Sequence, residues 1–206
     1  MGVVTLPFDV ETARMAVAKK GLDRLKAACD TVVVVDNNRL VKVAGNLPFR
    51  EALGVANTTI GKFVKGITET ITTASLINLD YADVRSVMKD AGSALMGIGR
   101  AGGPDRAVEA ARQAISSPLL EASIDGARGV LISIAGSSDI GLQEISAAAR
   151  MVAAVVHPDA NIIFGAVIDD TQGDQVKVTV IAAGFDGGAL PSNRKSADTQ
   201  SKPFAP

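Results

Sequence analysis

The sequence has no tryptophan, one tyrosine, one histidine and one cysteine, and aromatic residues make up 3% of its 206 residues. A single cysteine, Cys29, excludes a disulfide framework and a multi-cysteine metal site, and it suits a reducing compartment. So few aromatic side chains argue against a base-stacking surface for nucleic acid. The lone histidine, His157, has no second histidine or cysteine with which to form a zinc site or a catalytic triad, so we predict a structural role for it and no metal site.

An excess of charge of one sign is also lacking, as are long hydrophobic runs. The formal net charge is −1 and the isoelectric point is about 5.8, so no global field attracts nucleic acid or an anionic membrane. No apolar run approaches the roughly 18 residues that cross a bilayer, and no signal peptide is visible. The sequence therefore predicts a cytoplasmic protein with no nucleic-acid partner and no direct membrane insertion.

Apolar residues are abundant at 47%, which is typical of a folded chain with a substantial core. Their spacing predicts two sheets on either side of a long helix: a parallel α/β part, then an α+β part with about four strands. The sequence "TQGD" between the last two strands has the length of a hairpin loop. The expected strands are 2–6, 31–36, 93–99, 129–135, 161–169 and 175–185, and the expected helices are 10–28, 46–56, 58–73, 81–91, 105–116 and one that ends near 156.

The stretch "GIGRAGG" contains the pattern G-x-G-x-x-G at Gly97, Gly99 and Gly102, between an expected strand and an expected helix. A dinucleotide site also needs an acidic residue about 20 positions later, at the end of a second strand. Glu121 lies near that distance but does not end a strand. The pattern therefore favours a flexible loop after the strand, and an enzyme that uses a nucleotide cofactor is an alternative.

The stretch "SLINLDYADV" places Asn78, Asp80 and Asp83 in the pattern N-x-D-x-x-D, just before an expected helix. Asp80 at the N-cap with Asp83 in the first turn would satisfy free backbone N–H groups and the helix dipole. The same two carboxylates could instead orient an attacking water, or act on a phosphate through a metal ion. The residues alone favour the cap.

Several segments resemble the FtsZ family, the prokaryotic tubulin-like GTPases of cell division. They are "GVVTLPF", "GLDRLKAACDTVVVVDNNRL", "NLPFREALGVAN", "TTASLINLDYADVRSVM", "ALMGIGRA" and "NIIFGAVIDD", in the family's order over about residues 2–185. The resemblance implies the tail end of a GTPase domain at 1–57, a central connecting helix at 58–74 and the GTPase-activating C-terminal domain at 75–185. The polar composition after Phe185, rich in glycine, serine and proline, predicts a disordered tail at 186–206.

The resemblance also implies a function. Members of this family assemble head to tail, with GTP and Mg²⁺ as cofactors, at the cytoplasmic division site, where other division proteins are further possible partners. Each subunit's acidic loop completes the GTPase site of its neighbour. Asp80 and Asp83 would then position the attacking water, and Asn78 would shape the loop.

The nucleotide side of the resemblance rests on Glu11, Arg14, Asn57 and Thr58. Thr58 stands where the family commonly has an aspartate that reads guanine, and a hydroxyl cannot make the same paired contact. The family's glycine-rich phosphate segment, of the type GGGTGSG, does not occur in this sequence. We therefore expect the chain alone neither to bind nor to hydrolyse GTP. An inactive tubulin-like module that caps a polymer is a further alternative.

Overall fold

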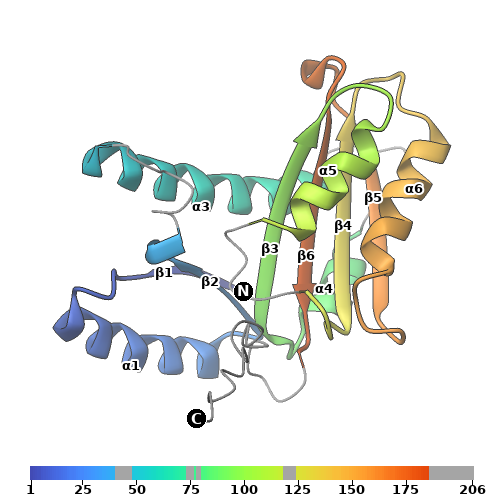
Figure 1. Ribbon diagram of the computed structural model, residues 1–206. Coiled ribbons are helices and arrows are strands. Elements are labelled where there is room, and N and C mark those ends of the chain that lie inside the picture. Colours follow the sequence, from blue (N-terminus) through green and yellow to red (C-terminus); the bar gives the residue numbers. More distant parts are fainter. Residues whose placement is uncertain (40–47, 73–76, 78–79, 118–123, 186–206) are drawn as a thin grey trace, which may run out of the picture.

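The computed structural model describes residues 1–39, 48–72, 77, 80–117 and 124–185. In these residues one six-stranded sheet has the order β1-β2-β3-β6-β4-β5 and is flanked by helices (Figure 1). This mixed architecture confirms the α/β fold class. The elements are β1 Gly2–Leu6, α1 Thr12–Ala28, β2 Thr31–Asp36, α3 Phe49–Thr72, α4 Tyr81–Met88, β3 Gly92–Ala101, α5 Arg106–Ile115, β4 Gly129–Gly136, α6 Leu142–Ala153, β5 Asn161–Ile168, the 3-10 helix η1 Asp170–Gln172, and β6 Val176–Ala183.

The two expected sheets are joined into one. β1 and β2 are parallel along their whole length, and β2 then pairs in parallel with β3 at three positions, residues 31–33 with 92–94. Two contacts beside the junction hold it: the Gly92 N–H donates to the Asp30 carbonyl at 2.8 Å, and the buried Thr31 hydroxyl donates to the Met88 carbonyl. The apolar run of β2 is buried, as expected for a central parallel strand.

The expected hairpin between β5 and β6 is wrong, because β4 lies between these strands. β4 pairs in parallel with β5 and antiparallel with β6. The connection contains the 3-10 helix η1, so the chain passes over the end of β4 instead of making a tight turn. β4 is buried along nearly all of its length, which suits a strand with neighbours on both sides.

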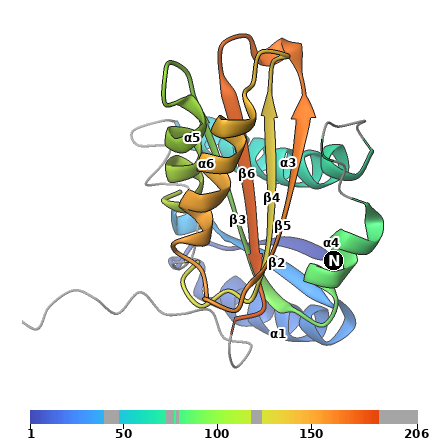
Figure 2. The same cartoon turned by 90° about the vertical axis from the view of Figure 1, so that its right-hand side faces the viewer.

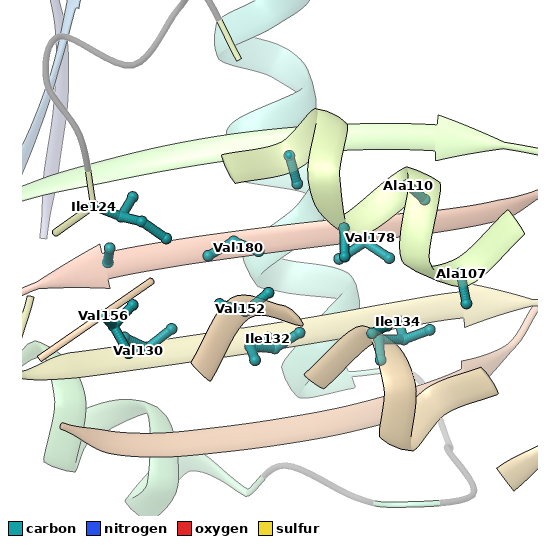
Figure 3. Packing of buried hydrophobic residues seen from close by; sticks show 14 of the residues in the cluster. Ala107, Ala110, Ile124, Val130, Ile132, Ile134, Val152, Val156, Val178 and Val180 are labelled. Carbon is teal, nitrogen blue, oxygen red and sulfur yellow. The ribbon is translucent and has the colours of Figure 1, made fainter. Parts of the chain in front are cut away.

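The sheet has two covered faces. α5 and α6 lie against one face, and α3 and α4 lie on the other (Figure 2). Figure 3 shows the first cluster, in which Val130, Ile132 and Ile134 of β4 alternate with positions that face the opposite side. The second cluster joins β2, α4 and the other face of the central strands through Val33, Val87 and Leu131, among others.

The strand expected at 93–99, which contains Gly97 and Gly99, is confirmed as β3 and continues to Ala101, so the loop expected in "GIGRAGG" begins only after that residue. Gly97 and Gly99 face α5, where a Cβ atom would overlap the carbonyl oxygens of Ala114 and Ala110 respectively. The glycines therefore let a helix approach a strand closely. This packing role also removes the support for a nucleotide cofactor at this pattern.

The expected helices at 46–56 and 58–73 form one helix, α3, of 24 residues. Asn57 and Thr58 have modest helix propensity, but both are helical because they lie inside this longer helix. The proposed boundaries of the connecting helix and of the domains stay predictions. Within the described residues, no helix is both long and apolar enough to cross a membrane.

Candidate functional site

Asp80 and Asp83 form a reciprocal capping box at the start of α4. The Asp83 N–H donates to Asp80 Oδ1 at 2.8 Å, and the Asp80 N–H donates to Asp83 Oδ2 at 3.2 Å. Asp80 has the extended backbone of an N-cap, with φ −85° and ψ 171°. The cap predicted from the sequence is therefore confirmed, and each of the two side chains is held by the other's backbone.

The capping box is anchored from both directions along the chain. After it, Val84, Val87 and Met88 of α4 are buried in the second core cluster. Before it, Ile77 exchanges two backbone hydrogen bonds with Ala166 of β5, at 3.4 and 3.2 Å. The acidic pair therefore sits at a fixed place on the surface beside the sheet edge. Asn78, the third residue of the pattern, lies outside the described residues.

Both carboxylates remain accessible. Asp80 is exposed and Asp83 is half-buried. In the described part of the chain, one oxygen of each carboxylate accepts a backbone N–H, and the second oxygen is left for a water or a cation. No group of three or more potential metal ligands occurs among these residues. The arrangement suits the positioning of a water at a surface that a second molecule completes.

Glu11 and Arg14 lie at the carboxyl end of the parallel strands, where nucleotides commonly bind in such sheets. Glu11 is the N-cap residue of α1; its side chain accepts the Phe8 N–H at 3.2 Å and forms an ion pair with the exposed Arg14. Next to them, the Asp9 N–H donates to Asn38 Oδ1 at 3.1 Å. Sequence reasoning missed Asn38, although polar residues directly after a buried strand were a signal for it.

Asn57 and Thr58 are exposed on α3. Thr58 precedes the last residue of that helix by 14 positions (72 − 58), which corresponds to about 20 Å along the helix axis. The acidic pair follows the end of the helix. The last 14 residues of α3 and the segment after it therefore lie, along the chain, between these two candidates and the acidic pair Asp80 and Asp83.

A second charged cluster, which sequence reasoning missed, surrounds Arg106 at the start of α5. The residue is 8% exposed. Its guanidinium donates to both Glu144 carboxylate oxygens, at 2.9 and 3.2 Å, to Asp139 Oδ2 at 3.1 Å and to the Asp174 carbonyl at 3.1 Å. The hydrogen bonds from Arg106 lower the pKa of Glu144, and those from Ser137 and then Arg106 lower the pKa of Asp139. The cluster ties the starts of two helices to two loops.

His157 follows α6 and takes part in two hydrogen bonds there. Its Nδ1 accepts the Asp159 backbone N–H at 3.1 Å, and the His157 backbone N–H donates to the Ala127 carbonyl at 3.2 Å. Cys29 is half-buried at the end of α1. Neither residue lies in the capping box or in the cluster around Arg106.

Comparison with known proteins places the fold. The C-terminal domain model of the FtsZ family matches residues 92–186. The structure of an FtsZ dimer from M. jannaschii, described as empty, superposes with a TM-score of 0.86 at 39% sequence identity, over 97% of this chain. The chain belongs to the FtsZ family. A tryptophan-to-tyrosine mutant of M. jannaschii FtsZ matches 89% of the chain at 42% identity, with a TM-score of 0.83.

A third solved structure extends the likeness in fold beyond FtsZ. CetZ2 from Haloferax volcanii, in a protofilament with bound GTPγS, has a TM-score of 0.72 at 20% identity over 88% of this chain, and it matches over 55% of its own length. The chain spans 60% of the FtsZ dimer's chain and 55% of the mutant's. The resemblance to FtsZ is confirmed, and the roles of the site residues stay predictions.

Proposed function

We propose that this chain acts in a GTP-dependent, head-to-tail polymer of the division-ring type. Its acidic loop, Asn78, Asp80 and Asp83, completes the GTPase site of the neighbouring subunit. Self-association is supported by the FtsZ dimer and the CetZ2 protofilament among the similar structures. The proposal places the chain in the cytoplasm at the division site, with GTP and Mg²⁺ held mainly by the subunit that receives the loop.

The observation that carries this proposal is the rigid, accessible acidic pair, separated along the chain from the chain's own nucleotide-side candidates by the last part of α3. Two reciprocal hydrogen bonds fix the carboxylates, and α4 fixes the pair to the core. Positioning is most of what phosphoryl transfer requires of a protein. Because Thr58 lies about 20 Å along α3 from that helix's end, the pair is suited to a nucleotide bound by another subunit.

The chemistry follows from the free carboxylate oxygens. Asp80 and Asp83 accept hydrogen bonds from a water and hold it in line with the γ-phosphate of the partner's nucleotide. Two carboxylates next to a polyphosphate repel it across a short distance. Mg²⁺, when bound, supplies the positive charge that offsets this repulsion. The chain's own contribution is therefore the orientation of the water and the acceptance of its proton.

GTP turnover by mixtures tests the proposal. Three reactions are compared: this chain alone, an intact FtsZ loaded with Mg-GTP alone, and the two together. We expect no turnover by the chain alone and a changed rate in the mixture. Asp80→Ala should abolish that change.

Asp80→Asn is the matched control for folding. Asparagine caps a helix about as well as aspartate, whereas loss of the cap in Asp80→Ala costs about 1 kcal/mol. If the carboxylate charge positions the water, both variants lose the effect on the partner's rate. An effect that survives in both variants would overturn the catalytic role and favour a capping module. Turnover by the chain alone would contradict the division of the site between two subunits.

A further inference from the structure

The sheet ends on one side in a hydrophobic strand that has only part of a neighbour. β5 is the last strand of the sheet and pairs with β4 on its inner side (Figure 2). On its outer side, within the part of the chain that the structure describes, it makes a single bridge, between Ala166 and Ile77. In those described residues the stretch 161–164 therefore has no strand beside it at this open edge.

The direction of the backbone groups in this stretch follows from the Ile77 bridge. Ala166 exchanges both of its backbone hydrogen bonds with Ile77, so its N–H and C=O point to the open edge. These groups alternate between the two sides of a strand, and the register with β4 is unbroken from 161 to 168. The N–H and C=O of Ile162 and of Phe164 therefore also point to the open edge.

This edge lacks the features that protect most edge strands from pairing. β5 contains no charged residue and no proline, and its unbroken register with β4 excludes a bulge. Ile162 and Ile163 are half-buried, and Phe164 is 38% exposed. The open edge therefore offers main-chain hydrogen bonds together with an apolar surface, which is the combination that an added β-strand uses.

A carboxylate lies near each end of this stretch. Asp159, two residues before β5, is exposed. Asp80, also exposed, follows the Ile77 bridge by three residues. From there α4 runs towards the start of the sheet's last two strands, since a Cβ atom built on Gly129, the first residue of β4, would be 3.1 Å from Val87 Cγ1. The acidic pair at the start of α4 is therefore near the bridged end of β5.

The cations of α4 lie on its other flank. Arg85 and Lys89 line one cavity with Thr31 of β2, which belongs to the opposite half of the sheet. They therefore do not neutralise the carboxylates beside β5. A second copy of the chain, paired edge to edge through β5, would bring its own acidic pair to the same place, and like charges oppose that arrangement. A strand with positive charge at its ends is the better complement.

We propose that the open edge of β5 binds an extended segment of a partner protein by β-strand addition. This segment has apolar residues at alternating positions and lysine or arginine at its ends. Its main chain exchanges hydrogen bonds with Ile162 and Phe164, and its apolar side chains pack beside theirs. Its terminal cations face Asp159 and Asp80. The Ile77 bridge limits the added strand to the first part of β5.

Titration of the full chain with a synthetic strand peptide tests the proposal. The probe is the capped peptide lysine–valine–threonine–valine–threonine–valine–lysine. We expect saturable binding of one peptide per chain in calorimetry, and slower hydrogen exchange of the Ile162 and Phe164 amides in NMR. A fully N-methylated peptide keeps the side chains but has no N–H donors, so it should bind about tenfold more weakly. Glutamate in place of both lysines should weaken binding by a similar factor.

Phe164→Pro and Phe164→Leu are the matched variants. Proline removes an N–H that points to the open edge and not to β4, so it leaves the β4–β5 ladder intact. Leucine keeps both the N–H and an apolar side chain. We expect Phe164→Pro to weaken peptide binding by about tenfold, and Phe164→Leu by less than about threefold. Asp159→Asn, a change at an exposed position, should weaken binding of the lysine peptide alone and leave that of the glutamate peptide unchanged or stronger.

Several results would overturn the proposal. They are the absence of saturable binding, equal affinity for the N-methylated peptide, and an unchanged affinity in Phe164→Pro. Sedimentation that showed the chain pairing with a second copy, and losing this pairing in Phe164→Pro, would make a copy the occupant of the edge and would also overturn it. None of these measurements depends on GTP turnover, so the proposal stands or fails separately from the role of the acidic loop.

Discussion

At the scale of single residues, Arg106 is the side chain whose loss should cost the most stability. It is buried and makes hydrogen bonds to two carboxylates and a carbonyl. Arg106→Ala removes several charge-assisted hydrogen bonds at once, so we expect the free energy of unfolding to fall by about 2 kcal/mol in urea denaturation. Arg112→Ala breaks only an exposed pair and should change it by less than about 0.5 kcal/mol. Equal losses of unfolding free energy in Arg106→Ala and Arg112→Ala would contradict the stabilising role assigned to Arg106.

The same cluster predicts a loss of stability in acid. Folding lowers the pKa of Asp139 and Glu144 below their ordinary values of 3.8 and 4.5. The stabilisation that these two carboxylates contribute is therefore complete at pH values above their ordinary pKa values. It is lost as the pH falls through their lowered pKa values in the folded protein. The urea midpoint should decrease below about pH 4.5, and it should decrease less in the Glu144→Gln variant. An identical acid dependence of the two proteins would contradict this prediction.

The acidic pair and the cluster around Arg106 differ in how well the sequence could predict them. Asp80 and Asp83 are three positions apart, so their cap is a local pattern that the sequence displays. Arg106 meets Asp139, Glu144 and the Asp174 carbonyl at separations of 33, 38 and 68 residues. Contacts at such separations depend on the strand order, which no local pattern contains.

At the scale of elements, the close packing of α5 on β3 predicts that Gly97→Ala lowers the free energy of unfolding, whereas a control variant in α3 should raise it. Gly97→Ala places a methyl group where the Ala114 carbonyl lies, so we expect a loss of about 2 kcal/mol in the free energy of unfolding. Gly61→Ala in α3 meets no atom within 4 Å and should add about 1 kcal/mol, because alanine favours a helix over glycine. Thermal unfolding measures both. A stable Gly97→Ala variant would show that α5 can move away.

Most elements could be predicted from hydrophobic spacing, whereas their connections could not. The run 31–36 and the strands of the C-terminal part appear where the alternation and apolar runs placed them. The β5–β6 hairpin failed because loop length does not reveal that β4 pairs with both strands. The break expected near Asn57 failed because helix propensity at two positions is outweighed by the 24-residue helix around them.

At the scale of the whole molecule, burial is uneven between the β1 edge of the sheet and its centre. α1 has no buried residue and β1 is half-buried throughout, whereas β6 is buried at nearly every position. Segments with few buried contacts open at low free energy. We therefore expect backbone amides of α1 to exchange hydrogen faster than those of α5 and β6 in mass spectrometry. Equal protection of α1 and α5 would contradict this expectation.

Tyr81, the first residue of α4, gives the chain a tyrosine fluorescence signal beside the acidic pair. It is the only tyrosine in a chain without tryptophan, it is 68% exposed, and it follows Asp80 directly. Ultraviolet emission from the chain, when phenylalanine is not excited, therefore arises at one point beside the acidic pair. Docking of a tryptophan-free partner on this loop would alter that emission without any attached dye. The molecule thus carries its own fluorophore at the surface where the proposed neighbour would bind.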